Sequence, residues 1–241
     1  MNAKVDVSMR YSLARLNVVY ERPFRQPVFQ VSKSAVEILD CLYGRLNPKY
    51  PMAMSDLTAS SALSMGEIAI RARLFNGNGL LELSVEKFTA RFEGLRNKQD
   101  VEIVKDAITL SEDALENALP GTNYEGAAIR TSAWLSCDDG DQGVQDLLEK
   151  FGTPKLKLRR NEFGAEKIKT PVRAQLTNEK EGWAVNFFLD TSELAGAHLF
   201  FLCDGVYIET GKFSNFAERA NHLENVYEKL LEHYGLEPIS D

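Results

Sequence analysis

Basic residues are concentrated in one segment of the chain, and their spacing suits binding better than catalysis. Between positions 155 and 173 only Glu162 and Glu166 offset the cations. The seven basic residues of this segment are Lys155, Lys157, Arg159, Arg160, Lys167, Lys169 and Arg173. The 155–159 stretch alternates basic residues with leucine, which places the charges on one face of a predicted strand. Such a patch suits an acidic protein, a phosphate-bearing ligand or a nucleic-acid backbone. A solvated sheet face, or basic strands that protect an edge from aggregation, is the more common explanation of such residues.

Carboxylates gather in the loop at residues 137–143, between a predicted strand and a predicted helix. Asp138, Asp139 and Asp141 could hold calcium or magnesium, which makes a metal-dependent hydrolase one alternative. With Asp138 counted as position one, a glycine falls at position six and a glutamate at position twelve, as in a calcium-binding EF-hand loop. Positions three and five, where such a loop has oxygen ligands, are Gly140 and Gln142. An acidic residue capping the following helix explains the same residues. We therefore predict no metal site.

The sequence contains none of the compact motifs of nucleotide binding or nucleophilic catalysis. Neither Gly-x-x-x-x-Gly-Lys nor Gly-x-Gly-x-x-Gly opens a predicted helix, and no Gly-x-Ser-x-Gly turn is present. The histidines, His198, His222 and His233, are dispersed along the chain. We predict no catalytic residues and no cofactor, which favours a non-enzymatic protein.

Composition indicates a folded, acidic chain. The 241 residues are 44% hydrophobic and carry a formal net charge of −7, so the whole molecule repels phosphate backbones and nucleic acid is disfavoured as a partner. The three cysteines lack ligand or disulfide spacing and are expected to be free thiols. No apolar run reaches the length of a signal peptide or a membrane span, so we expect a cytoplasmic protein that does not enter a membrane.

Periodicity in the first half predicts one long strand, one helix, several strands and a long helix. Residues 5–20 alternate with a phase shift near Ala14 and Arg15, which predicts a strand with a bulge. A capping box at Ser34 and Glu37 predicts the start of a helix that ends near residue 47. Strands are predicted at 54–62, 67–75, 80–85 and 87–92, with a turn at residues 76–79. The apolar stripe over 99–119 predicts the long helix.

The second half has the same order of predicted elements. Strands are predicted at 124–136, 155–160, 166–176 and from 183, with a short helix at 141–151. Asp204-Gly205 is a two-residue turn signal, so 198–203 and 206–210 are predicted to form a hairpin. A final helix is predicted over 214–234, with Gly235 as its C-terminal cap.

These elements predict an α+β fold with mainly antiparallel, curved sheet covered by two long helices. The repeated order fits two tandem β-α-β4-α halves, 1–121 and 122–241, packed as one unit by internal duplication. This order resembles the helix-grip arrangement of TATA-binding-protein-like repeats and of START-like lipid and ligand carriers. The resemblance implies a curved sheet around a long helix and carries over no functional residue.

Three functions remain open from the sequence. We favour a binding or assembly protein that engages a macromolecule, with a protein as the expected partner, through a sheet face and the 155–173 segment. A small-molecule or lipid carrier is the second, with a cavity lined by residues such as Trp183, Phe187, Leu223 and Tyr227. The third is the hydrolase using Asp138, Asp139 and Asp141. The sequence does not indicate an oligomeric state.

Overall fold

One large, mainly antiparallel sheet organises the protein. The computed structural model describes residues 9–60, 69–152 and 171–239. Its strands are β1 (Met9–Pro23), β2 (Leu57–Ser60), β3 (Ala69–Leu74), β4 (Gly79–Ser84), β5 (Lys87–Leu95), β6 (Gly126–Cys137), β7 (Val172–Asn178), β8 (Trp183–Thr191), β9 (Leu199–Ile208) and β10 (Leu236–Pro238). The order in the sheet is β2-β3-β4-β5-β1-β6-β9-β8-β7, and β10 pairs in parallel with the start of β1.

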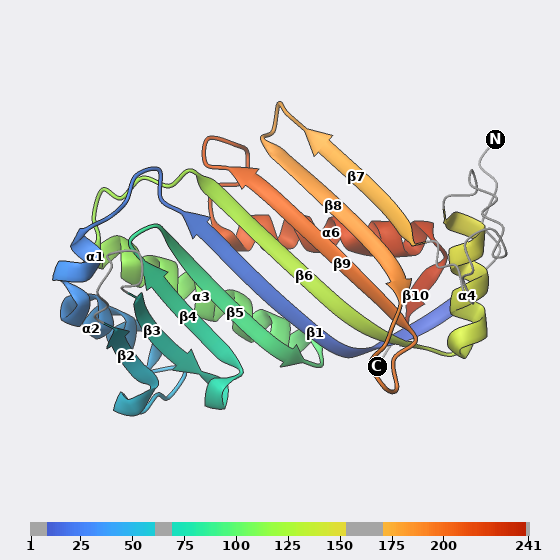
Figure 1. Cartoon of the computed structure of the whole chain (residues 1–241), viewed down its shortest axis with the longest axis horizontal. Helices are drawn as coiled ribbons and strands as arrows, with labels where there is room; N and C mark the ends of the chain where they lie inside the picture. Colours follow the sequence, from blue (N-terminus) through green and yellow to red (C-terminus); the bar gives the residue numbers. More distant parts are fainter. Residues whose placement is uncertain (1–8, 61–68, 153–170, 240–241) are drawn as a thin grey trace, which may run out of the picture.

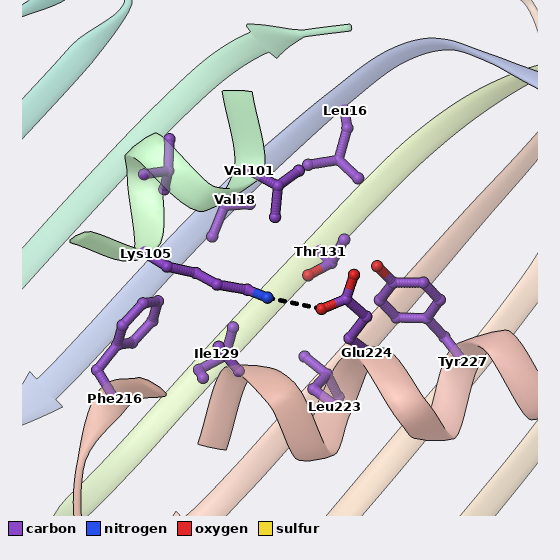
Figure 2. A pocket seen from close by; sticks show the side chains of 12 residues that line it. Leu16, Val18, Val101, Lys105, Ile129, Thr131, Phe216, Leu223, Glu224 and Tyr227 are labelled. Carbon is purple, nitrogen blue, oxygen red and sulfur yellow. Dashed lines mark hydrogen bonds and ion pairs between the residues drawn. The ribbon is translucent and has the colours of Figure 1, made fainter. Parts of the chain in front are cut away.

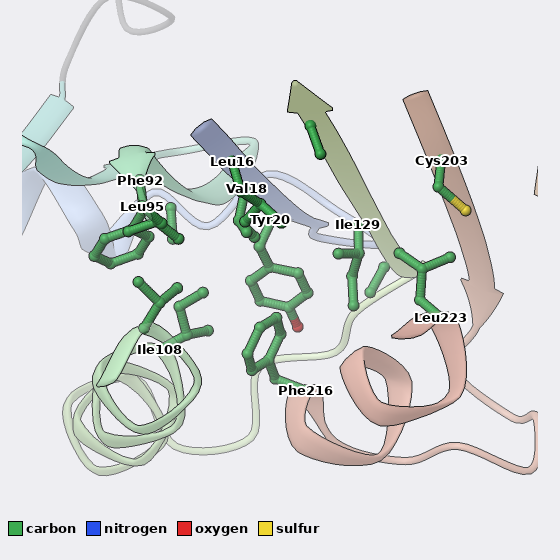
Figure 3. Packing of buried hydrophobic residues seen from close by; sticks show 14 of the residues in the cluster. Leu16, Val18, Tyr20, Phe92, Leu95, Ile108, Ile129, Cys203, Phe216 and Leu223 are labelled. Carbon is green, nitrogen blue, oxygen red and sulfur yellow. The ribbon is translucent and has the colours of Figure 1, made fainter. Parts of the chain in front are cut away.

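The two long helices, α3 (Lys98–Ala118) and α6 (Phe216–His233), lie behind the sheet on one face (Figure 1). Shorter helices are α1 (Gln30–Lys33), α2 (Ala35–Leu46) and α4 (Gly140–Phe151). Figure 3 shows Ile108 of α3 and Leu223 of α6 pointing at side chains of the sheet, with Phe216 and Tyr20 between the helices. The predicted α+β class, an antiparallel sheet covered by two long helices, is confirmed. None of the helices in the described ranges is long and apolar enough to cross a membrane.

Local sequence explains most helix and turn boundaries. Asn97 and Asn215 cap α3 and α6, each accepting a hydrogen bond from the backbone N–H three residues on. The predicted turn between β3 and β4 is present, and Phe75, Asn76 and Gly77 have positive φ there, of 53°, 55° and 91°. The capping box at Ser34 is wrong, because its side chain makes no cap hydrogen bond. Ser34 directly follows α1, and its N–H donates to the carbonyl of Gln30, so its backbone does not take the extended conformation of an N-cap.

The predicted bulge in β1 is present and determines which side chains face the helices. The register of β1 against β6 shifts between Leu13 and Arg15, and the register against β5 shifts between Leu16 and Val18. Beyond the shifts, Leu16, Val18 and Tyr20 are buried. An extra residue is what allows one long strand to keep its apolar side chains on the helix face while it twists.

The predicted hairpin at Asp204-Gly205 is wrong. These two residues lie in the middle of β9, which pairs continuously with β6 on one side and β8 on the other. A Cβ atom on Gly205 would lie 2.9 Å from the Leu223 methyl of α6 and 2.9 Å from the Tyr207 ring. Glycine is therefore required here because a helix packs close to the strand. The glycine that predicted a turn instead makes room for a side chain of that helix.

The central pair of the sheet is β1 and β6. On one side follow β5, β4, β3 and β2, and on the other β9, β8 and β7, so on each side strands that are consecutive in sequence are neighbours in the sheet. The internal duplication and the division at residue 121 remain predictions. The predicted strand at 155–160 lies outside the described residues.

Candidate interaction face of the sheet

One face of the sheet carries no helix over its described strands, and we call it the open face (Figure 1). Side chains alternate between the two faces of each strand. In β6, Ala133 and Leu135 are buried against the helices, whereas Trp134 between them is on the open face and only half-buried. The same alternation in the neighbouring strands determines the composition of the open face.

Aromatic and aliphatic side chains form a cluster on the open face, which we call the aromatic patch. It consists of Trp134, Phe188, Phe200 and Leu202, from three adjacent strands. Trp134 lies directly opposite Phe200, with ring centroids 5.2 Å apart, and Phe188 lies 6.4 Å from Phe200. All four side chains are half-buried, so their remaining apolar surface is in contact with water.

Two arginines flank the aromatic patch. The Arg15 guanidinium lies 5.4 Å from the centroid of the Trp134 ring, and the Arg173 guanidinium lies 5.5 Å from that of Phe188. Both arginines are directly opposite these rings in the strand registers. A cation over an aromatic face is attracted by the negative charge of the π system, which holds each arginine at the margin of the patch. A row of two cations with three aromatic rings between them therefore extends from β1 to β7.

The apolar surface continues along β9 beyond the patch. Val206 and Ile208, on the same side of the strand as Leu202, are 49% and 48% exposed. Asp204 separates them from Leu202 and accepts a 2.6 Å hydrogen bond from Arg130. That bond and the charge of Asp204 raise the pKa of Arg130 above its ordinary value. β9 is thus almost entirely apolar on both faces, a pattern typical of strands covered on both sides.

Charge on the open face differs in sign from that of the whole chain. From β3 to β9, with β1 taken beyond its bulge, the described strands place seven cations there: Arg15, Arg71, Arg73, Lys87, Arg91, Arg130 and Arg173. The five carboxylates of the same surface are Glu21, Glu82, Glu93, Asp190 and Asp204. Ion pairs occupy four of these carboxylates, with Arg71, Lys87, Arg15 and Arg130. The face is mildly positive in a chain whose net charge is −7.

The structure describes only one member of the predicted basic segment. Arg173 is exposed in β7, at the margin of the aromatic patch. The other six, Lys155, Lys157, Arg159, Arg160, Lys167 and Lys169, lie outside the described residues. The sequence did not predict the aromatic patch, because Trp134, Phe188 and Phe200 lie in three different strands whose pairing registers bring them together. The signal that could have revealed it is the continuous apolar run from 199 to 203 in β9, which puts apolar side chains on both faces of the strand.

A polar network lies on the opposite side of the sheet, where the ends of β1 and β9 meet α3 and α6. Arg22 donates to Glu112 at 2.8 Å and to Glu209 at 2.6 Å, and the fully buried Arg219 donates to Glu209 at 2.9 Å. Burial alone would raise the pKa of Glu209, but the two guanidinium groups outweigh it and lower that pKa. The pKa of Tyr20, which donates to Glu112, is raised well above its ordinary value by burial and by that carboxylate. Partnered buried charges of this kind join elements together, so we assign the network a structural role.

The described residues give no support to the ligand cavity beside the last helix or to the metal site in the acidic loop, the two other sites that the sequence raised. The gap enclosed by the sheet, α3 and α6 has a volume of about 30 Å³, and the ion pair of Lys105 with Glu224 crosses its mouth at 2.7 Å (Figure 2). That volume holds about one water molecule. In the acidic loop, Asp138 is paired with Arg10 at 3.0 Å. No group of three or more histidine, cysteine or acidic side chains in the described ranges is arranged to hold a metal ion.

Comparisons with known proteins assign no family. No family model matches the sequence, and no curated protein matches it. Among solved structures, the TBP of Methanococcus jannaschii aligns over 92% of this chain and 99% of its own, with 10% sequence identity and a TM-score of 0.33. A similarity at that level of identity and TM-score gives no basis for assigning function.

Proposed function

We propose that the protein is a non-enzymatic binding or assembly protein that engages another protein through the open face and the basic 155–173 segment. The observation that carries the proposal is the aromatic patch with arginines on both sides. Aromatic and arginine side chains are the residues most enriched at the energetic centres of protein interfaces. The patch is left in contact with water in the isolated chain, where its burial would be favourable.

Polar surroundings of the aromatic patch also fit an interface. Asn186 and Gln175 lie beside it on β8 and β7, and paired charges surround it on β1, β5 and β6. A central apolar cluster with a polar, solvent-accessible rim is the usual arrangement of a protein–protein contact. The five carboxylates among the seven cations make the face a poor match to an unbroken phosphate backbone, which supports a protein over a nucleic acid.

Site-specific photocrosslinking tests this proposal. Benzoylphenylalanine replaces Phe188 on the open face, and in a matched control it replaces Asn225, which is exposed on α6. In cells that express the protein, position 188 is expected to yield a covalent adduct with one protein that position 225 does not yield. Adding Arg173→Glu is expected to reduce that adduct. Equal adducts from both positions, or an adduct digested by nuclease, would contradict the proposal.

A further inference from the structure

The shape of the apolar surface along β9 restricts what can cover it. From Phe200 to Ile208 the strand advances eight residues, a length of about 27 Å at the usual rise of a strand. Across β6, β9 and β8 the aromatic patch is about 10 Å wide, two strand spacings. A helix is about 10 Å in diameter, and about 18 helical residues span 27 Å. The apolar surface therefore has the dimensions of a single helix lying along β9.

The charges beside this surface indicate what the margins of such a helix must carry. Arg15 lies on the β1 side and Arg173 on the β7 side, so a cation flanks the apolar surface on both edges. Two acidic residues adjoin the surface: Asp204 already accepts from Arg130, and Asp190, directly opposite Phe200, accepts from the backbone N–H of Thr191. On the β7 edge, carboxylates of a bound segment would gain the Arg173 guanidinium. On the β1 edge they would share Arg15 with Glu93, which pairs with it at 3.4 Å. Cations of a bound segment would meet like charge at both arginines.

We infer that the open face takes an amphipathic helix of a partner protein, with an apolar stripe along β9 and carboxylates on both edges of that stripe. This inference rests on the proposed function and specifies its partner. A helix can place carboxylates only where the guanidinium groups lie. A single-stranded nucleic acid carries a phosphate at every residue, and along β9 its phosphates would meet Asp204 and Asp190 as well as the arginines. The rings of the patch are tilted by 50° and 64° to one another, so they form no flat platform for stacked bases.

Two synthetic helical peptides of about 18 residues test the inference, because they share one leucine stripe and differ only in having Glu or Lys along its edges. Binding of each labelled peptide is measured by fluorescence anisotropy at about 0.15 M salt, where long-range attraction is screened. The net charge of −7 favours the Lys peptide, whereas the open face favours the Glu peptide. We expect the Glu peptide to bind about tenfold more tightly, because two marginal charge contacts change sign between the peptides.

Matched variants locate the binding. Arg15→Gln combined with Arg173→Glu is expected to abolish the preference for the Glu peptide. Lys229→Glu, a charge reversal at an exposed position of α6, is expected to leave it unchanged. The three positions changed here are exposed or half-buried, so the variants are expected to fold, and circular dichroism verifies this. A preference that survives the double variant would overturn the inference.

Other occupants give distinct results. An oligonucleotide of roughly 12 nucleotides is long enough to fill a stacking groove. If such a single strand binds more tightly than the Glu peptide, the face is assigned to nucleic acid and the inference is overturned. A dimer in sedimentation velocity that Arg173→Glu dissociates would assign the face to a second copy and also overturn it. The helix inference is overturned if the Lys peptide binds more tightly than the Glu peptide, if the two bind equally, or if neither binds. If crosslinks from position 188 persist in that case, the proposed binding face stands, and if they are also absent, both fail.

Discussion

Arg173 on β7 and Phe188 on β8 lie directly opposite each other, with the guanidinium carbon 5.5 Å from the ring centroid. This relationship joins the one described member of the predicted basic segment to the aromatic patch. Arg173 is exposed, so its contact with the ring contributes little to folding and is available to a partner. The arrangement makes the arginine a contact residue of the open face.

Arg173→Glu is therefore expected to separate binding from stability. The free energy of unfolding should change by less than about 0.5 kcal/mol, as is usual for an exposed side chain away from buried groups. The photocrosslink from position 188 should decrease strongly, because a carboxylate replaces the marginal cation. Urea unfolding and crosslink yield are the two measurements. A large loss of stability with unchanged crosslinking would contradict this assignment.

Gly205→Ala is expected to destabilise the protein by about 1–3 kcal/mol, the usual cost of overpacking a core. The new methyl group would lie 2.9 Å from the Leu223 methyl and from the Tyr207 ring, and the Tyr207 hydroxyl is held by the carbonyl of Arg219. Gly44→Ala is the matched control, because Gly44 lies in α2 with nothing within 4 Å of an added Cβ. That control should stabilise the protein by about 0.5–1 kcal/mol through helix propensity. Thermal unfolding of both variants decides whether Gly205 is a packing residue.

The Glu209 network predicts a dependence of stability on pH. The pKa of Glu209 is lowered from its ordinary value of 4.5 in the folded protein. Its contribution to stability is therefore full above pH 4.5 and is lost as the pH falls through the lower folded-state pKa. Glu209→Gln should cost about 3 kcal/mol at neutral pH, because it removes the charged partner of the buried Arg219 and leaves Arg22 paired with Glu112 alone.

Unfolding free energies of wild type and Glu209→Gln, measured at pH 7 and in acid, test this prediction. The difference between the two proteins should shrink in acid. Glu232→Gln, at an exposed position of α6, is the control and should change stability little at either pH. A difference between wild type and Glu209→Gln that is independent of pH would show that the carboxylate is not stabilised by its arginines.

The thiols are expected to react at very different rates. Burial, followed by nearby carboxylates, raises the pKa of Cys137 and of Cys203 to about 12, so at pH 8 almost none of either is thiolate. The thiolate is the reactive form. Cys41 is half-buried, and it should account for any fast reaction of the native protein with a disulfide reagent. Cys41→Ala should remove that fast phase, and a fast phase that remains would show that β6 or β9 opens readily.

Much of the fold could be predicted from local patterns. The bulge in β1, the turn at Asn76 and the stripes of α3 and α6 each follow from the spacing of a few residues. The prediction of a turn at Asp204-Gly205 was wrong because glycine serves two purposes: it lets a chain reverse, and it makes room for a neighbouring side chain. Only the position of Leu223 distinguishes the two. The aromatic patch could not be predicted because Trp134, Phe188 and Phe200 meet through strand registers that no local pattern determines.

The most direct test of the open face as a binding surface is to compare hydroxyl-radical oxidation of its rings in the purified protein and in cells that express it. Trp134 and Phe200 should be oxidised readily in the purified protein and several-fold less in cells, where a partner covers them. Tyr43, half-buried in α2, should be oxidised equally in both and serves as the control. Equal oxidation of Trp134 and Phe200 in the two settings would contradict the central claim that this face is covered by a partner.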